Sequence, residues 1–411
     1  AANTIGGASE STRNLISGNG EDGVVIQNPA STGNLVAGNF IGTTLQGDDS
    51  IGNAFNGIEI DQANSNTIGG MAPGMGNLLS GNGFAGVNIF EGANTTIQGN
   101  MIGCDITGST AIANVDSGIA LQQGTSNTLI GGPNAEARNV ISGNNLDGIT
   151  LNTSSSGNTI VGNFIGTDGT GLLPLGNKFS GIAVFTSDNR IGGSEAGERN
   201  VIGDNGVFGI GVQLADRNIV QGNYIGIGAD GSTPLGNRGT TLGGTGDGIF
   251  LEKASSNTIV DNVVSNNNSN GIHLFDNSNE NVVQGNYVGT DANGALGRPN
   301  AGRGVNISRG SSNNLVGGET EGAGNVVAFS ADHGVRVREG TANAILGNSI
   351  HSNDLLGIQL NNDGVTLNDP LDVDVGPNGL QNFPEIRSAT TTESEVTVQG
   401  VLNSTPDTEF R

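Results

Sequence analysis

The chain has little aromatic or sulfur chemistry. Its 411 residues include no tryptophan and one cysteine, and aromatic residues make up 4% of the total. So few aromatics, set against 72 glycines, cannot fill several separate globular cores. The single cysteine, Cys104, excludes an internal disulfide framework, and we interpret it as a small structural residue where equivalent loops carry threonine.

Positive charge is also scarce. Lysine and arginine total 15 against 39 aspartates and glutamates, which gives a net charge of −24. This charge repels phosphate backbones and anionic lipid headgroups, so nucleic acid and acidic membrane surfaces are excluded as general partners. Charged residues are nevertheless only 13% of the chain, and the apolar residues are mostly Ile, Val and Leu, so a disordered chain is not expected.

Long apolar runs are missing as well. No segment approaches the roughly 18 apolar residues of a membrane span, and no basic and then apolar leader opens the chain, so membrane insertion is not predicted. The first residues already belong to a repeat, and the last residues stop inside an alternating pattern. We therefore expect a piece of a longer secreted protein, located outside the cell or on its surface.

What the sequence does contain is an internal repeat. Twelve coils, about 31 residues each, begin near residues 3, 34, 66, 95, 128, 158, 189, 218, 257, 281, 314 and 343. Each coil has three short apolar patterns. The first reads Asn-x-Ile/Val in ten coils, the second starts with Asn in all twelve, and the third reads Gly followed by alternating aliphatic residues, as in Gly57 to Ile60.

Alternation with a period of two, in runs of three to five residues bounded by Gly and Asn, predicts strands with one face inside and one outside. Such short strands cannot bury an aliphatic face alone, but stacked coils turn each position into a continuous ladder. The sequence therefore predicts an all-β fold, a right-handed parallel β-helix of about twelve three-strand coils over residues 1–361. The Asn columns are interpreted as structural, since Asn can bond backbone at a bend and the Asn of the next coil.

Insertions occur at two fixed corners of the coil. Coils starting near 3, 66, 128, 189 and 314 lengthen the first corner with a Gly-Gly loop, and those starting near 34, 95, 158, 218 and 281 lengthen the second. The coil at 257 is short, and the coil before it carries an extra Gly-rich segment from Arg238 to Gly246. Irregularity of this kind is where a functional site is easiest to place.

The motifs Asn-Thr-Ile-Gly-Gly, Asn-Val-Ile-Ser-Gly-Asn (139–144) and Gly-Asn-Phe-Ile-Gly-Thr-Asp (162–168) resemble the β-helix repeats of large bacterial extracellular proteins. That group is similar in fold to the pectate lyase superfamily, which implies the fold but no single activity. Residues 368–384 resemble the segment that closes such β-helices before a β-sandwich. We therefore expect a closing segment at 362–385, and the start of a truncated β-sandwich domain or a linker at 386–411.

Candidate chemistry gathers on the outer face of the third strands in coils eight to eleven. The candidate catalytic residues are Glu252, His273, His333, Arg336 and Arg338, and the candidate ligand-binding residues are Phe250, Lys253 and Phe275. An aromatic ring beside a histidine, a carboxylate and two arginines could hold an acidic sugar, with His273 or His333 as general base. The alternative interpretation is a polar outer face with scattered residues. The remainder of this face is expected to carry no site.

A calcium site is a separate hypothesis. Asp369, Asp372, Asp374 and Asn378 place hard oxygen ligands at short spacing in a turn rich in Gly and Pro, which favours Ca²⁺ as the one cofactor. By contrast, the loops of Asp168, Asp230 and Asp291 offer one carboxylate each, so these aspartates are interpreted as turn residues.

Two functions remain open from the sequence. The leading hypothesis is a non-catalytic extracellular β-solenoid, a surface-layer, adhesive or filament component that associates with itself or with neighbouring domains of a longer chain and contacts extracellular polysaccharide. The alternative is an enzyme, a polysaccharide lyase, hydrolase or epimerase acting on acidic glycans. Similarity to pectate lyases would imply a calcium-carboxylate cluster with a facing Arg or Lys, and similarity to polygalacturonases would imply clustered aspartate pairs with a histidine and a basic partner. Neither arrangement can be matched residue by residue to this chain. The sequence therefore favours the non-catalytic hypothesis.

Overall fold

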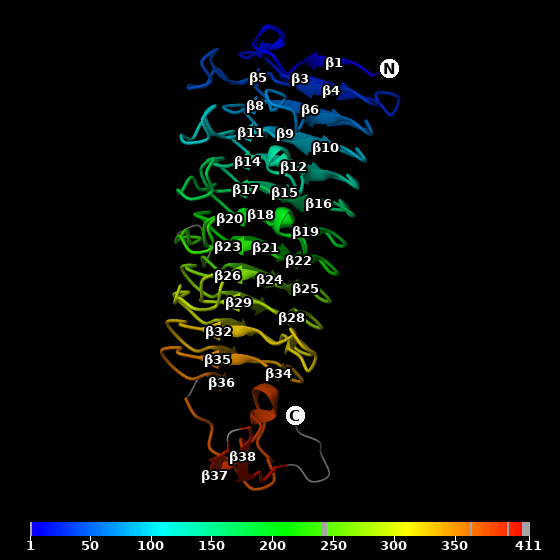
Figure 1. Cartoon of the computed structure of the whole chain (residues 1–411). Helices are drawn as coiled ribbons and strands as arrows, with labels where there is room; N and C mark the ends of the chain where they lie inside the picture. The colour runs from blue at the N-terminus through cyan, green and yellow to red at the C-terminus, as the bar shows by residue number, and fades with distance from the viewer. Residues whose placement is uncertain (1, 240–244, 362–363, 393, 405–411) are drawn as a thin grey trace.

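The computed structural model describes residues 2–239, 245–361, 364–392 and 394–404. Three parallel sheets of twelve strands each wind into a right-handed β-helix, and every strand pairs with its counterparts in the coils before and after it (Figure 1). The predicted fold class is confirmed. The strands are short and follow one another closely, so each coil adds one layer to a rod.

The first sheet holds the Asn-x-Ile/Val strands. They are β1 (Thr4–Gly6), β4 (Leu35–Ala37), β7 (Thr67–Gly69), β10 (Thr96–Gln98), β13 (Leu129–Gly131), β16 (Thr159–Val161), β19 (Arg190–Gly192), β22 (Ile219–Gln221), β25 (Thr258–Val260), β28 (Val282–Gln284), β31 (Leu315–Gly317) and β34 (Ala344–Leu346).

The second sheet holds the strands that follow the invariant Asn. They are β2 (Leu15–Ile16), β5 (Phe40–Ile41), β8 (Leu78–Leu79), β11 (Met101–Ile102), β14 (Val140–Ile141), β17 (Phe164–Ile165), β20 (Val201–Ile202), β23 (Tyr224–Ile225), β26 (Val263–Val264), β29 (Tyr287–Val288), β32 (Val326–Ala328) and β35 (Ser349–His351).

The third sheet holds the strands that follow the Gly. They are β3 (Val24–Gln27), β6 (Ile58–Asp61), β9 (Val87–Phe90), β12 (Ile119–Gln122), β15 (Ile149–Leu151), β18 (Ile182–Val184), β21 (Ile210–Gln213), β24 (Ile249–Glu252), β27 (Ile272–Phe275), β30 (Val305–Ile307), β33 (Val335–Val337) and β36 (Ile358–Leu360).

Register places like residues on top of one another inside the rod. Ile97 pairs with Ile130, and Ile130 pairs with Ile160, in one of these ladders. All three side chains are fully buried and belong to one aliphatic core that runs through every coil. Branched aliphatic side chains thus supply the core that aromatic residues supply elsewhere. Glycine is required where a corner passes close to the next coil: at Gly131, with φ of +87°, a Cβ would collide with the carbonyl oxygen of Val161.

Asparagine ladders hold the corners between the strands. In the second column, Asn139, Asn163 and Asn200 are fully buried, and each side-chain oxygen accepts hydrogen bonds from the backbone and side-chain N–H groups of the Asn before it. The first column works in the same way except at Thr95 and Thr128. A third column, which the sequence analysis did not identify, runs from Asn19 through Asn53 and Asn82 to Asn300. Three ladders rather than two therefore stabilise the rod.

The Gly-Gly loops of alternate coils carry short 3₁₀ helices, η1 (Glu10–Thr12), η2 (Ala135–Ala137) and η3 (Ala196–Glu198). Each is followed by an arginine whose guanidinium covers an aromatic ring of the next coil. The pairs are Arg13 over Phe40, Arg138 over Phe164 and Arg199 over Tyr224, at 4.2, 4.1 and 3.9 Å from the ring centroid. These contacts close the second sheet from outside.

The second-corner loops of the other coils contact one another across the intervening coil. Backbone hydrogen bonds join Gly169 to Gly108, Ala229 to Gly171 and Ala292 to Gly231. Asp168, Asp230 and Asp291 accept backbone N–H groups of their own loops, as expected for turn residues. For Asp291, the N–H of Leu296 is the main reason that the pKa is lowered. The loop positions are therefore set at a spacing of two coils.

After the last coil, residues 364–384 lie against the end of the rod and include η4 (Pro377–Leu380). A hollow of about 750 Å³ separates them from Ile345, Ile358 and Leu360. Strands β37 (Glu385–Thr391) and β38 (Val396–Val401) then form an antiparallel hairpin whose residues are exposed. The sandwich to which this hairpin was assigned stays a prediction. The longest helix in the described parts of the chain has four residues, so none of them could cross a membrane.

Candidate functional site

The outer face of the third sheet presents three columns of side chains. They come from the residue before the conserved Gly and from the second and fourth residues after it, which in the coil of β24 are Asp247, Phe250 and Glu252. The strands alternate, so these positions cannot point into the aliphatic core. Register stacks each position on its equivalents in the neighbouring coils, as in the pairing of Phe250 with His273 and of His273 with Asn306.

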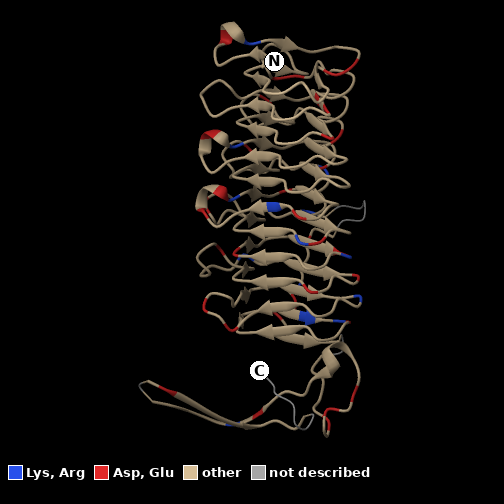
Figure 2. Cartoon of the chain, turned by 90° about the vertical axis from the view of Figure 1, so that its right-hand side faces the viewer, with Lys and Arg blue, Asp and Glu red and all other residues tan. Residues whose placement is uncertain are grey.

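A groove opens on this face over the first four coils. Its volume is about 690 Å³, and its lining combines carboxylates, carboxamides and phenylalanines: Asp22, Gln27, Phe55, Asn56, Glu59, Asp61, Phe84, Ala85, Asn88, Phe90, Asp116, Ala120 and Gln122. None of these lining residues is basic. Figure 2 shows that acidic residues are spread along the rod and outnumber the basic ones. The groove would therefore repel an anionic ligand.

Three phenylalanine rings line the groove. Phe55 and Phe84 lie in the loops that precede β6 and β9, with ring centroids 5.5 Å apart and ring planes inclined at 51°. They are 43% and 47% exposed, although large apolar side chains on a regular coil are normally covered. Phe90, at the end of β9, adds a third ring. Exposed aromatic faces next to polar groups are typical of a binding site.

Glu59, on β6, also lines the groove. Its Oε2 accepts hydrogen bonds from Nδ2 of Asn88 at 2.8 Å and from Nδ2 of Asn56 at 3.0 Å. Burial, which outweighs the bond from Asn88, and the nearby charges of Asp22 and Asp61 raise the pKa of Glu59 to about 7. This carboxyl can therefore be protonated close to neutral pH, which an ordinary glutamate cannot.

The groove lies outside coils eight to eleven, where the sequence analysis placed its candidate residues. Glu59 and Asp61 lie in the outward columns, but Phe55 and Phe84 lie in loops just before the third strands. Reading the strand columns alone leaves these loops out. The sequence feature that indicates the groove is a phenylalanine two residues before the conserved Gly in two consecutive coils, Phe55 and Phe84, in a chain that has few aromatic residues.

The predicted patch divides into two groups. In the first, Phe250, His273 and Phe275 pack together, with the His273 ring centroid 5.4 Å from Phe250 and 5.3 Å from Phe275. Phe208 stacks on Phe250 at 4.4 Å and completes an apolar cluster. His273 is 7% exposed, and its two ring nitrogens contact Asp247 and Ser308.

Two charged members of the patch lie at the rim of this cluster. Glu252 accepts a hydrogen bond from Gln213 at 2.7 Å, and Lys253 forms an ion pair with Asp276 at 3.1 Å. Neither contact joins them to His273. The structure therefore brings Phe250, Phe275 and His273 together but leaves Glu252 and Lys253 in pairs of their own.

The second group surrounds Asp332. Its carboxylate binds Arg303 at 2.7 Å and faces Nε2 of His333 at 3.2 Å, while Nδ1 of His333 accepts the N–H of Leu356 at 3.0 Å. Burial and the charge of Arg303 lower the pKa of Arg336 to about 10, and burial likewise lowers the pKa of His333. Arg338 is exposed at the end of β33. The group is positively charged, in contrast to the groove.

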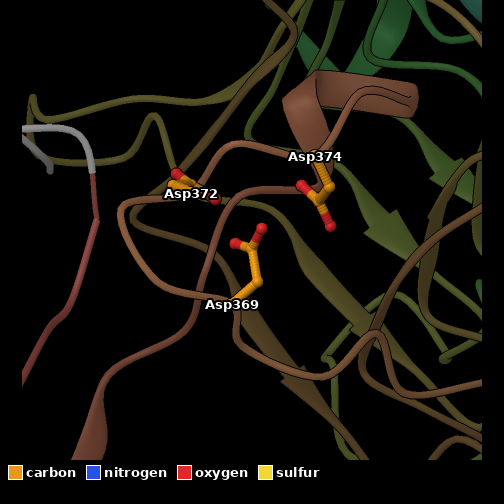
Figure 3. Close-up of side chains that lie close together, drawn as sticks. All are labelled: Asp369, Asp372 and Asp374. Carbon is orange, nitrogen blue, oxygen red and sulfur yellow. The ribbon is translucent and has the colours of Figure 1, made fainter.

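The predicted calcium ligands also divide. The carboxylates of Asp369, Asp372 and Asp374 converge, with one oxygen of each within 4.8 Å of the others (Figure 3). Desolvation and the charges of the other two raise the pKa of Asp374. Asn378 has another role: its side-chain oxygen accepts the N–H of Asn343 at 3.0 Å, and it thereby extends the first asparagine ladder by one member.

Comparison with known proteins adds a fold and a family similarity. Residues 175–326, less than half of the chain, match the family described as "Periplasmic copper-binding protein (NosD)". A search of curated protein sequences found no match.

Among solved structures, the chain is similar to the periplasmic alginate epimerase AlgG, with 16% sequence identity and a TM-score of 0.44 over 84% of this chain and 68% of that one. It is also similar to the Dettilon tailspike protein, with 16% identity and a TM-score of 0.47 over 93% of this chain and 67% of that one. A third similar structure is an alginate lyase from Paenibacillus sp. str. FPU-7, with 15% identity and a TM-score of 0.33 over 85% of this chain and 98% of that one. No residue role in this chain rests on these similarities.

Proposed function

We propose that this chain is an extracellular or periplasmic β-solenoid that binds a carbohydrate chain on the outer face of its third sheet. The observation that carries the proposal is the groove over the first four coils, where three phenylalanine rings face carboxylates and carboxamides. Aromatic rings pack against the apolar faces of sugar rings, and carboxylates and amides bond the hydroxyl groups at their edges.

The charge of the groove indicates the kind of carbohydrate. Glu59, Asp61 and Asp116 line it without a compensating cation, so a uronic acid polymer would be repelled and a neutral or amino sugar chain is favoured. This differs from the acidic glycan that the arginine-containing patch suggests. A rod of twelve coils, about 55 Å long, offers room for several sugar units and for the structural, adhesive role expected from the sequence.

The test is calorimetric titration of the protein with cellohexaose, laminarihexaose, chitohexaose and oligogalacturonate. We expect at least one uncharged oligosaccharide to bind, and Phe84→Ala to weaken its binding by roughly tenfold or more. Phe185→Ala is the matched control, because Phe185 is an exposed phenylalanine that directly follows β18 of the same sheet and lies outside the groove. Binding of oligogalacturonate alone, or equal effects of the two variants, would contradict the proposal.

Glu59 favours a second candidate function, hydrolysis of the bound glycan. A carboxyl with a pKa of about 7 next to the aspartate side chains of the groove has the character of a general acid in glycoside hydrolysis. Release of new reducing ends by the wild type, abolished in Glu59→Gln with binding retained, would establish this activity. Binding without release of reducing ends would leave the non-catalytic role.

Calcium binding by Asp369, Asp372 and Asp374 belongs to the proposal as well. Three convergent carboxylates repel one another in a chain of net charge −24, and a hard cation would relieve this repulsion. An all-oxygen set suits calcium better than copper, the metal in the name of the matching family. We also propose that the rod associates with further copies of itself or with neighbouring domains of a longer chain.

A further inference from the structure

Three side chains from three successive coils form a continuous hydrogen-bonded line on the third sheet. Nδ1 of His273 lies 3.1 Å from Oδ2 of Asp247, and Nε2 of His273 lies 3.0 Å from Oγ of Ser308. The three residues are 0%, 7% and 3% exposed for Asp247, His273 and Ser308. The line lies outside the groove of the proposed carbohydrate site, and the inference below does not depend on that site.

The order of the three groups is fixed from the aspartate end. Oδ1 of Asp247 accepts the backbone and side-chain N–H groups of Asn270 at 2.8 and 2.7 Å, and Oδ2 accepts the hydroxyl of Thr245. Burial acts against ionisation of Asp247, but the hydrogen bond from His273, together with the charge of His273 when it is protonated and the hydrogen bonds from Thr245 and Ser269, lowers the pKa of this carboxyl. An ionised Asp247 can only accept, so Nδ1 of His273 must donate to it.

The imidazole tautomer follows from this. With the proton on Nδ1, Nε2 of a neutral His273 is an acceptor, and the hydroxyl of Ser308 donates to it. Phe250 and Phe275 contact each other and both meet the His273 ring edge to face, each with an interplanar angle of 73°, which restricts rotation of the imidazole. A hydroxyl that donates to an oriented imidazole, itself held by a buried carboxylate, has the geometry of an activated nucleophile.

We propose that Ser308 is a nucleophile and His273 its general base, that Asp247 positions His273, and that the three cleave carboxylic esters with a small acyl group. Oγ of Ser308 forms a bond to the acyl carbon while Nε2 of His273 takes the hydroxyl proton. The ester oxygen then leaves as an alcohol with that proton. Water attacks the acyl-serine, His273 takes its proton and returns it to Ser308, and a carboxylic acid is released.

Neighbouring residues define the size and polarity of the substrate. Ser308 is little exposed, so an acetyl-sized acyl group fits better than a long chain. Arg336, on the next coil, pairs in register with Asn306. The backbone N–H of Arg338, two residues further on, donates to the carbonyl of Ile307, so Arg338 lies opposite Ser308. Both arginines belong to the coil next to Ser308, and we assign to their positive charge the stabilisation of the negative charge that develops on the acyl oxygen. Arg309 covers Phe275 at 5.0 Å and borders the same place.

Another coil supplies a natural comparison. Thr150 is also a nearly buried outward hydroxyl of the third sheet, bonded to Ser117 at 2.9 Å and to Asp147 at 3.2 Å. That network contains a hydroxyl and a carboxylate but no imidazole, so it should have no nucleophilic activity. Thr150→Ala is therefore the matched control for Ser308→Ala.

The first experiment uses a fluorophosphonate probe on the whole chain, with the modified residue located by mass spectrometry. We expect one label per chain, on Ser308. The label should be absent in Ser308→Ala, unchanged in Thr150→Ala, and formed roughly a hundredfold more slowly in His273→Asn. Wild-type protein that stays unlabelled at Ser308, or equal labelling in His273→Asn, would overturn the proposal.

The second experiment follows hydrolysis of p-nitrophenyl acetate and tests Asp247. Asp247→Asn should lower kcat by at least about tenfold with little change in KM, because it disturbs the base and not the binding of the ester. A loss of the far-UV circular dichroism signal in parallel would assign the effect to folding and would overturn the role of Asp247. Because neither probe carries a sugar, failure of the carbohydrate proposal would leave both results unchanged.

Discussion

Removal of one asparagine from the middle of the second ladder tests how the rod is stabilised. The side chain of Asn163 makes five hydrogen bonds: its amide donates to Ile130, Val161 and Asn200, and its oxygen accepts from the backbone and side chain of Asn139. Asn163→Ala leaves the buried N–H of Asn139 without the acceptor it uses. The Val161 carbonyl keeps the N–H of Gly132.

The magnitude follows from these contacts. A buried donor that loses its acceptor costs about 1–3 kcal/mol, and the cavity and the remaining lost bonds add to this, so we expect Asn163→Ala to lower the free energy of unfolding by about 3–4 kcal/mol. The control is Asn348→Ala in the last coil, where the side chain is only partly buried: its oxygen accepts the backbone and side-chain N–H groups of Asn325 and its amide donates to Val316, but at this end of the rod water can replace it as the acceptor. Its cost should be about 1 kcal/mol.

Urea denaturation followed by far-UV circular dichroism measures both variants, and amide hydrogen exchange shows whether protection is lost around the substituted coil. The middle variant must be the more costly one. The contrary result is that Asn163→Ala lowers the free energy of unfolding by less than about 1 kcal/mol, or by no more than Asn348→Ala does. Either outcome would mean that the asparagine ladders do not stabilise the rod and that the aliphatic ladders alone hold the coils together.

Two further outcomes are expected. Since burial raises the pKa of Glu59 from its ordinary value near 4.5 to about 7, ionisation penalises the folded state increasingly between these two pH values. Glu59→Gln should therefore gain about 1–2 kcal/mol of stability relative to the wild type between pH 4 and pH 8, a figure reduced for partial exposure, and an equal difference at both pH values would refute this. Chelation of calcium should speed amide exchange in residues 364–384 while the coils stay protected, and identical exchange with and without Ca²⁺ would rule out the metal site.

The fold was predictable because its information is periodic. Val or Ile three residues into each coil and Asn at each second strand recur regardless of what the loops do, and stacking is the one way for such short strands to bury them. The third asparagine ladder was equally periodic, but Asn53 and Asn82 lie in loops of different length and so escape a strand-centred reading.

The candidate site was only partly predictable. His273 and its two phenylalanines were found because they lie in the outward columns of the same strand and the strand next to it. Asp247 and Ser308 are offset diagonally by one column and one coil, and sequence spacing does not indicate which diagonal neighbours a side chain will choose. Asn378 was placed with the aspartates by proximity in sequence, whereas its side chain bonds Asn343 in the last coil. Such pairings depend on side-chain direction rather than on composition.

The loops that contact one another across an intervening coil have a consequence for how such a rod can change its length in evolution. Gly108, Gly171 and Gly231 each accept a hydrogen bond from a loop two coils further on, at a separation of roughly 9–10 Å. Deletion of a single coil would bring two of these loops onto adjacent coils, in about half the space. Gain or loss of two coils at once preserves the spacing of these loop contacts. We therefore expect such rods to lengthen or shorten by pairs of coils, about 62 residues at a time.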